Sequence, residues 1–451
     1  MGKELLFKVL KHEKVDEVPW VPFAGVHAGK LKGYSAEEIL KDPDKLFESL
    51  MEVKKLYAPD GMPIVFDLQI EAEIMGCDLL WAKDNPPSVK SHPYADEKKI
   101  PCNCAIPTEE SGRIPMILDV MRRMKAAVGD EVALYGLVCG PFTLASHLRG
   151  SGIFMDMIED PAYVKSLVEF CSEVTIKMSE MYIDAGMDVI AVVDPLVSQI
   201  SPKHIEAMLS DSFKSVFEFI KAKGAFSSFF VCGNATPQMK VMCETGPDNI
   251  SVDENVNMVT AKEKTDAYNI VLGGNIPLTT TMLYGNQLDN MKFVVELLDK
   301  LNHHNLILSP GCDMPYDTPI ENVIAVGQAV KQTEACRKMI ENYEAVEEDI
   351  EVVIPDYKNL DKVLIEIFTL DSDTCAACTY MLKSVTDIYD EIKDIADYVE
   401  YKYTVKENIA RTKKMGLTNL PTMCIDGEIK WVSIIPDKTQ LLVQIKKCQR
   451  K

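Results

Sequence analysis

The sequence of 451 residues has no apolar run that approaches the ~20 residues a helix needs to cross a bilayer. Its first ten residues read as a charged amphipathic helix without a signal-peptide core, so we expect a cytoplasmic protein. A basic cluster is also lacking: Lys and Arg total 48 against 69 Asp and Glu, a net charge of −21. Such a chain binds a phosphate backbone poorly, which argues against nucleic acid as the substrate.

The composition also lacks the marks of disorder and of repeat proteins. Hydrophobic residues make up 47% of the chain, and the length suggests two or three domains, one of which could be a large barrel. In a cytoplasmic protein, the 13 cysteines point to metal binding, redox chemistry or buried thiols rather than to a disulfide framework.

Seven short apolar runs alternate with amphipathic helical stretches between about residues 60 and 315. The runs are residues 62–69, 132–138, 188–193, 228–232, 249–252, 269–272 and 306–308. Several are nearly continuous in hydrophobic residues, which is typical of parallel strands buried on both faces. The sequence therefore predicts an α/β fold, and a closed TIM (β/α)8 barrel fits better than an open sheet.

Polar or thiol side chains follow six of these predicted strands. They are Asp67, Cys139, Asp194, Cys232, Asp253 with Glu254, and Cys312 with Asp313. Any one of them could simply mark a turn. Because the active site of a barrel enzyme lies at the carboxyl ends of its strands, the six together predict one shared pocket at that rim.

A second unit is predicted after the barrel. A helix over residues 320–343 is followed by an acidic stretch, residues 344–351, and we place the boundary near residue 352, giving a barrel over 1–351 and a small domain over 352–451. The small domain is predicted to contain, in order, a strand at 363–370, a helix that opens with Cys375-Ala-Ala-Cys378, a strand near 399–404, a helix from 405 and a hairpin at 422–432.

The Cys-x-x-Cys segment at a helix start has a physical rationale. The helix N-terminus stabilises a thiolate at Cys375, and Cys378, one turn later, can resolve a mixed disulfide. With the later Leu-Pro-Thr at 420–422, the segment resembles the thioredoxin-like fold, in which a cis-proline, here Pro421, lies against the dithiol. Half of a zinc site is the alternative, although no second Cys-x-x-Cys or His pair lies nearby in this domain. The intervening Ala-Ala differs from the Gly-Pro of the family's main reductases, which leaves the redox partner open.

Five ordered segments of the barrel resemble the uroporphyrinogen decarboxylase superfamily over roughly residues 1–345. They are Gly-Pro-Phe-Thr-Leu-Ala at 140–145, Ile-Ser-Pro-Lys-His at 200–204, Cys-Gly-Asn-Ala-Thr-Pro at 232–237, Ser-Val-Asp-Glu at 251–254 and Ser-Pro-Gly-Cys-Asp-Met-Pro at 309–315. The resemblance implies the barrel fold independently of the strand pattern.

The decarboxylase branch of this superfamily holds a substrate with eight carboxylates. Its Arg-Gln-Ala-Gly-Arg segment stands here as Val-His-Ala-Gly-Lys at 26–30, so both arginines are lost, and lysine does not replace a bidentate guanidinium. By resemblance, Asp67 takes the place of the pyrrole-binding aspartate, His147 that of a tyrosine and Cys312 that of a late histidine. Porphyrinogen decarboxylation is therefore the alternative function.

The other branch contains corrinoid-dependent methyltransferases, whose zinc site is His-x-Cys followed about 80 residues later by Cys. Here Cys232 and Cys312 keep the two thiols, while Phe230 stands in place of the histidine. Two cysteines are too few for zinc, and His147, Asp194 or Glu254 would have to complete the site. Without metal, the two cysteines would be plain thiols or a redox pair served by the C-terminal dithiol.

The leading hypothesis is a corrinoid-linked methyltransferase with a fused dithiol domain. Asp67 and His147 would position or protonate a small-molecule methyl donor or acceptor, and zinc would activate it. The chain has no Asp-x-His-x-x-Gly segment, so the corrinoid (cobalamin) would come on a partner protein. Cys375 and Cys378 would keep a thiol reduced or act on a disulfide substrate. A third hypothesis is a barrel without catalysis that serves as a platform for the redox domain.

Overall fold

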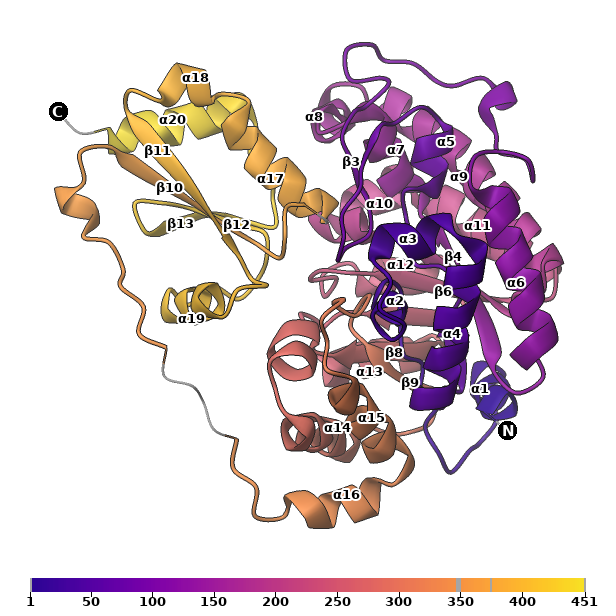
Figure 1. The fold of residues 1–451 in the computed structure, drawn as a ribbon. Coiled ribbons are helices and arrows are strands. Elements are labelled where there is room, and N and C mark those ends of the chain that lie inside the picture. The colour runs from indigo at the N-terminus through magenta and orange to yellow at the C-terminus, as the bar shows by residue number, and fades with distance from the viewer. Residues whose placement is uncertain (1, 346–349, 374, 450–451) are drawn as a thin grey trace. The chain divides into compact units, whose positions relative to one another are not determined.

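The computed structural model describes residues 2–345, 350–373 and 375–449. The chain forms two compact units: the larger comprises residues 2–197 and 201–345, and the smaller comprises the described residues after 345 together with Ser198–Ile200. Each unit is described separately below (Figure 1). Part of the predicted acidic boundary, residues 344–351, lies outside the described residues. Within the described residues, no helix is long and apolar enough to span a membrane.

The larger unit is built on a seven-stranded parallel sheet in the order β1-β4-β5-β6-β7-β8-β9. The strands are β1 (Gly61–Pro63), β4 (Ala133–Cys139), β5 (Val189–Val193), β6 (Phe226–Val231), β7 (Asn249–Val252), β8 (Val271–Ile276) and β9 (Leu306–Pro310). Apart from Phe226, which is half-buried, every residue of these strands is buried. The prediction of an α/β barrel is confirmed, because each predicted run contributes a strand to one curled parallel sheet.

A short N-terminal segment lies between the two edges of this sheet. Trp20 forms a parallel bridge with Leu308 of β9, and the Asp60 N–H beside β1 donates to the Trp20 carbonyl over 2.9 Å. Residues 19–21 therefore take the place of the eighth strand and close the cylinder.

Helices cover the outside of the barrel (Figure 1). They are α1 (Gly2–Leu10), α2 (His27–Lys30), α3 (Ala36–Lys41), α4 (Pro43–Tyr57), α5 (Ile70–Ile74), α6 (Ile114–Val128), α7 (Pro141–Arg149), α8 (Gly152–Glu159), α9 (Pro161–Asp184), α10 (Pro202–Met208), α11 (Ser210–Ala222), α12 (Met239–Glu244), α13 (Met258–Ala267), α14 (Gln287–Lys300), α15 (Ile320–Lys331) and α16 (Thr333–Ile340), with a small hairpin of β2 (Leu79–Leu80) and β3 (Ser88–Val89). The predicted single helix over 320–343 was wrong: it breaks at Gln332, whose ψ of 46° leaves the helical region.

Aromatic side chains fill the inside of the barrel. The ring of Phe230 on β6 lies 4.9 Å from that of Phe23 and 5.9 Å from that of Phe66, and Tyr135 on β4 packs 6.1 Å from Phe23. All four side chains are buried, so the cylinder is a packed core below its mouth.

The smaller unit contains a four-stranded sheet in the order β11-β10-β12-β13. Its elements are β10 (Val363–Thr369), α17 (Ala376–Thr386), α18 (Tyr389–Ile392), β11 (Ala396–Lys402), α19 (Lys406–Lys414), β12 (Thr422–Ile425), β13 (Glu428–Val432) and α20 (Lys438–Cys448). Strands β10 and β11 run parallel, whereas β12 is antiparallel to β10 and to β13.

The two faces of this small sheet carry separate apolar clusters. Ile365 and Ile367 of β10 face one side and pack with residues of α17 and α20, including Met381 and Leu441. The alternate residue Phe368 faces the other side and packs with the segment after α19. Figure 1 accordingly shows α19 across the sheet from α17 and α20.

Candidate functional site

Cys232 and Cys312 meet at the mouth of the barrel. Cys232 directly follows β6 and Cys312 lies just after β9, two strands that are separated by β7 and β8 in the sheet. Their Sγ atoms are nevertheless 2.6 Å apart. Both side chains are partly exposed, and both pack on the aromatic core of the barrel. The structure thus brings together the two thiols on which the sequence-based hypothesis depends.

The end of β7 supports both cysteine loops. The Asp253 carboxylate accepts a hydrogen bond from the Gly233 N–H, next to Cys232. On the other side, a Cβ at Gly311 would lie only 2.6 Å from Oε2 of Glu254, so glycine is needed beside Cys312. The Gly311 N–H also donates to the Ile276 carbonyl over 3.0 Å. Burial and the adjacent Asp253 raise the pKa of Glu254, which favours a protonated carboxyl group beside the thiol pair.

Asp194 has a structural role at the rim. Its carboxylate accepts hydrogen bonds from the Phe142 N–H (2.9 Å), the Thr143 N–H (3.1 Å) and the Thr143 hydroxyl (2.6 Å), all at the start of α7. A Cβ at Gly140 would clash with this carboxyl group, 2.6 Å from its carbon. Asp194 therefore caps a helix, and as a third zinc ligand it would have to give up these bonds.

The thiol pair does not complete a zinc site. Among the described residues, no group of three His, Cys, Asp or Glu side chains is placed to hold a metal ion. Two sulfurs on one tetrahedral zinc would lie about 3.8 Å apart, given bonds of about 2.3 Å, and the observed 2.6 Å is shorter. Phe230, in place of the histidine ligand of the methyltransferase branch, is fully buried in the aromatic core.

Asp67 lies in a buried ion pair. Its carboxylate is 2.7 Å from the guanidinium of Arg113, which also bonds Glu73 over 2.7 Å and lies over the ring of Trp81. The Asp67 side chain is completely buried. The sequence did not single out Arg113, because it stands 46 positions away from Asp67 just before α6 and carries no motif.

Glu71 is a second rim carboxylate that the sequence did not indicate. It lies on α5, is 1% exposed, and accepts a hydrogen bond from the Cys139 N–H at the end of β4 over 3.0 Å. Its other oxygen has no hydrogen-bond partner among the described residues. Burial raises its pKa to about 7, so it can carry a proton near neutral pH.

His147 lies on α7 rather than at a strand end. Its ring is buried and its Nδ1 has no hydrogen-bond partner in the described part of the chain. Burial lowers the pKa of His147 to about 3, so the imidazole is neutral at physiological pH. Its predicted role in positioning a substrate stays a prediction; as a proton donor it would be poorly suited.

The segment that replaces the arginines of the decarboxylases offers little positive charge to a substrate. Lys30 forms an ion pair with Asp317 over 2.7 Å. His27 is buried between Tyr57 and the Tyr316 carbonyl, and burial lowers its pKa to about 4. A valine and a paired lysine therefore stand where two guanidinium groups would bind carboxylates, and the neutral imidazole lies between them.

The smaller unit carries the second thiol pair. Cys375 is the N-cap of α17, and its sulfur accepts a hydrogen bond from the Cys378 N–H over 3.4 Å. The hydrogen bond from the Cys378 thiol lowers the pKa of Cys375, helped by backbone N–H groups, whereas burial raises the pKa of Cys378. Cys375 is partly exposed and Cys378 is 1% exposed. The Leu420–Pro421 peptide bond, in the loop before β12, is cis.

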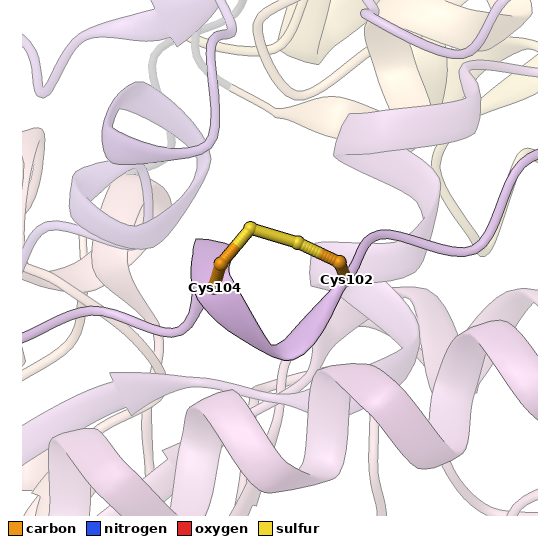
Figure 2. The surroundings of a disulfide bond; sticks show 2 residues. All are labelled: Cys102 and Cys104. Carbon is orange, nitrogen blue, oxygen red and sulfur yellow. A yellow bond between two sulfur atoms is a disulfide. The ribbon is translucent and has the colours of Figure 1, made fainter.

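A third pair of cysteines is joined in the structure. Figure 2 shows a disulfide between Cys102 and Cys104, on either side of Asn103 in an exposed loop of the barrel unit. The bonded sulfurs are not available as thiolate ligands in this form.

Comparison with known proteins identifies the family. A family model for uroporphyrinogen decarboxylase (URO-D) matches residues 1–333, and the chain belongs to this family. Methylcobamide:CoM methyltransferase MtbA from Methanosarcina acetivorans is 27% identical over 336 residues, which cover 73% of this chain and 97% of that protein. MtaA from Methanosarcina barkeri, also named a methylcobamide:CoM methyltransferase, is 26% identical over 72% of this chain and 96% of its own length.

Decarboxylases are similar to a comparable degree. A uroporphyrinogen decarboxylase from Wolbachia of Brugia malayi is 28% identical over 302 residues, covering 65% of this chain and 83% of that protein. Among solved structures, a methyltransferase from Methanosarcina mazei superposes with a TM-score of 0.67 at 25% identity and covers 74% of this chain and 99% of its own. The chain is therefore similar to enzymes of both branches. The choice between the two activities has to be argued from the residues at the barrel rim.

Proposed function

We propose that the barrel transfers a methyl group between a corrinoid, carried by a partner protein, and a small-molecule methyl donor or acceptor. The observation that carries this proposal is the meeting of Cys232 and Cys312 at the barrel mouth. By the resemblance described above, the methyltransferase branch has cysteines at these two positions. Relatives named as methylcobamide:CoM methyltransferases match over nearly their whole length. When bound, the corrinoid would supply the cobalt that carries the methyl group.

The charge of the rim favours this activity over porphyrinogen decarboxylation. Arg113 is already paired with Asp67 and Glu73, and Lys30 is paired with Asp317. The ends of the strands add further carboxyl groups, among them Asp253. An octacarboxylate entering this mouth would meet acidic groups and few unpaired cations, which opposes its binding.

The chain's own residues would act by orientation and proton transfer. We assign no step to zinc, because the described residues do not complete a zinc site. Glu254, beside Cys312, would hold or deliver a proton at a thiol, since its raised pKa keeps it protonated. The locked pair of Asp67 and Arg113 would form a fixed polar wall of the substrate site.

Two parallel assays on the full chain test this function. In the first, methylcobalamin and CoM are supplied under anaerobic conditions and loss of the methylcobalamin absorbance is followed. In the second, uroporphyrinogen is supplied and its products are separated by chromatography. We expect demethylation in the first assay and no decarboxylated product in the second. Decarboxylation alone would establish the alternative function, and inactivity in both would favour a barrel that serves as a platform.

We also propose that residues 352–451 form a thioredoxin-like domain that reduces disulfides. The supporting observations are the strand order around central β10, the dithiol at the start of the next helix, and the pairing of an accessible, acidified thiol with a buried one. Cys375 would attack and Cys378 would resolve the mixed disulfide. Free thiols of this kind persist in a reducing compartment such as the cytoplasm.

Reduction of insulin disulfides tests the dithiol. Cys375→Ser should abolish the activity, and Cys378→Ser should accumulate a mixed disulfide with the substrate. Cys448→Ser is the matched control, because Cys448 is also partly exposed in the same unit but lies at the end of α20. Equal activity of Cys375→Ser and Cys448→Ser would contradict the proposal.

A further inference from the structure

Cys232 and Cys312 are accessible thiols that face each other without a complete metal site, so they can react with each other. We infer that Cys232 and Cys312 are a redox couple, in which a two-electron oxidation joins their sulfurs in a disulfide and a dithiol reduces it again. The geometry of the pair, its accessibility among the barrel cysteines and the groups around it support this inference.

The other thiols of the barrel are poor candidates for such chemistry. Cys77, Cys139, Cys171 and Cys243 are buried, and burial raises the pKa of each of them, so they are thiols rather than thiolates. Cys336 is also buried, and Cys102 and Cys104 are already bonded to each other. Cys232 and Cys312 are the barrel thiols that combine partial exposure with a partner sulfur.

The separation of the two sulfurs suits bond formation. A disulfide has an S–S length of about 2.05 Å, so the observed 2.6 Å must shorten by about 0.5 Å. Both loops are anchored close to the cysteines: Gly233 bonds Asp253, Gly311 bonds the Ile276 carbonyl, and the Met314 N–H donates to the Phe23 carbonyl over 2.9 Å. The anchored backbone therefore holds the two sulfurs face to face.

Glu254 is placed to exchange the proton that moves when a thiol of the pair reacts. Its carboxyl group lies against Gly311, the residue before Cys312. A protonated carboxyl group at this place can donate its proton to the hydroxide that leaves a peroxide, or to a barrel thiolate as it is released.

The oxidation and the reduction each balance. A thiolate of the pair attacks a peroxide to give a sulfenic acid and hydroxide, and the second thiol condenses with it to give the disulfide and water, so two electrons pass from sulfur to oxygen. In the reverse direction, a dithiol thiolate attacks the disulfide and releases one barrel thiol. Its second thiol then attacks the mixed disulfide, releases the other barrel thiol and leaves the dithiol as a disulfide.

The chain itself offers a dithiol of the required class. Cys375 and Cys378 would reduce the barrel couple, within one chain or between two copies, and this step rests on the proposed reductase function of the smaller unit. The formation of the barrel disulfide does not rest on that function or on methyl transfer, because any small dithiol can reverse it.

Thiol mapping on the full chain tests both steps. The reduced wild-type protein is oxidised with one equivalent of hydrogen peroxide, blocked by alkylation and analysed by mass spectrometry for a peptide that joins Cys232 to Cys312. We expect this linked peptide to form and to disappear with dithiothreitol. At limiting dithiothreitol, the linked peptide should disappear with a half-time at least about tenfold shorter in the wild type than in Cys375→Ser.

The controls separate the outcomes. Cys102→Ser/Cys104→Ser should form the linked peptide as the wild type does, which excludes exchange with that exposed disulfide. Absence of the linked peptide, or about one zinc per chain that is lost in Cys312→Ser, would overturn the redox couple. A linked peptide with equal half-times in the wild type and Cys375→Ser would overturn only its reduction by the C-terminal dithiol.

Discussion

The buried carboxyl groups at the barrel rim differ in how their charge is compensated. Asp67 is paired with Arg113, Asp194 accepts three hydrogen bonds, and Glu71 accepts one while its second oxygen has no partner among the described residues. A buried charge without a partner is costly and favours the neutral form. The rim thus contains a fixed anion beside a carboxyl group that titrates near neutral pH.

Glu71→Gln should therefore change stability in a pH-dependent manner. Glu71 has a folded pKa of about 7 against an ordinary value of 4.5, so the folded state binds the extra proton between these values and the wild type loses stability as the pH rises through them. The variant cannot ionise and should be more stable than the wild type by up to about 3 kcal/mol at pH 8, and nearly equal to it at pH 4. Urea unfolding at both pH values measures the difference.

The control for Glu71 is Glu109→Gln, which removes a carboxylate that is 57% exposed. We expect it to change the free energy of unfolding by less than about 0.5 kcal/mol at either pH. If Glu71→Gln were destabilising to the same extent at both pH values, the account of a protonated, buried Glu71 would be wrong.

Arg113→Ala should destabilise the barrel strongly. The side chain of Arg113 is 12% exposed and that of Asp67 is fully buried, so the substitution leaves an uncompensated buried charge, at a cost of about 3–5 kcal/mol. Arg122→Ala is the matched control, because Arg122 is 54% exposed and its pair with Glu109 lies in solvent. It should cost less than about 1 kcal/mol. Equal losses in urea unfolding would show that the Asp67 pair does not compensate a buried charge.

At the scale of elements, β5 and α7 are joined through Asp194. Asp194→Ala leaves the N–H groups of Phe142 and Thr143 without their acceptor in a buried place, and we expect a loss of about 2–4 kcal/mol in the free energy of unfolding. Asp160→Ala also removes a helix cap, at the start of α9, but at a half-buried position, and should cost about 1 kcal/mol. A larger loss in Asp160→Ala would contradict the capping role of Asp194.

The strands were more predictable than the details of the elements around them. Continuous apolar runs, such as the one that became β5, identify a parallel strand because both of its faces are buried. The segment around Trp20 was missed because the two residues between Pro19 and Pro22 show no periodicity, and only the pairing with Leu308 makes this segment a strand. The break at Gln332 was missed because the amphipathic pattern continues on both sides of it.

The site residues that directly follow strands could be predicted, because strand ends place them at the rim. The partners that reach the site from distant elements could not. The meeting of Cys232 and Cys312 follows from their places after β6 and β9. The partners of Asp67 and Asp194 did not follow, because Arg113 and the start of α7 are distant in sequence and reach these carboxylates only through tertiary packing. His147 was expected at the rim but lies within α7, since the Gly-Pro pair before it starts the helix six residues earlier.

At the scale of the whole molecule, the chain combines a barrel of the uroporphyrinogen decarboxylase family with a second unit that lies beyond the family match. Each unit has its own thiol pair and its own apolar core. We propose that the barrel pair takes part in substrate chemistry and forms a redox couple, and that the pair in the smaller unit reduces disulfides. Substitutions in one pair should therefore leave the fold of the other unit intact.

The rate of methyl transfer from methylcobalamin by fully reduced single variants tests the role of the barrel thiols most directly. The account predicts that Cys232→Ser and Cys312→Ser each lose at least about 100-fold in rate, while Cys102→Ser/Cys104→Ser and Cys375→Ser keep the wild-type rate. Circular dichroism should show the same fold in all four. Wild-type rates in both Cys232→Ser and Cys312→Ser would contradict the claim that the two sulfurs at the barrel mouth form the reaction centre.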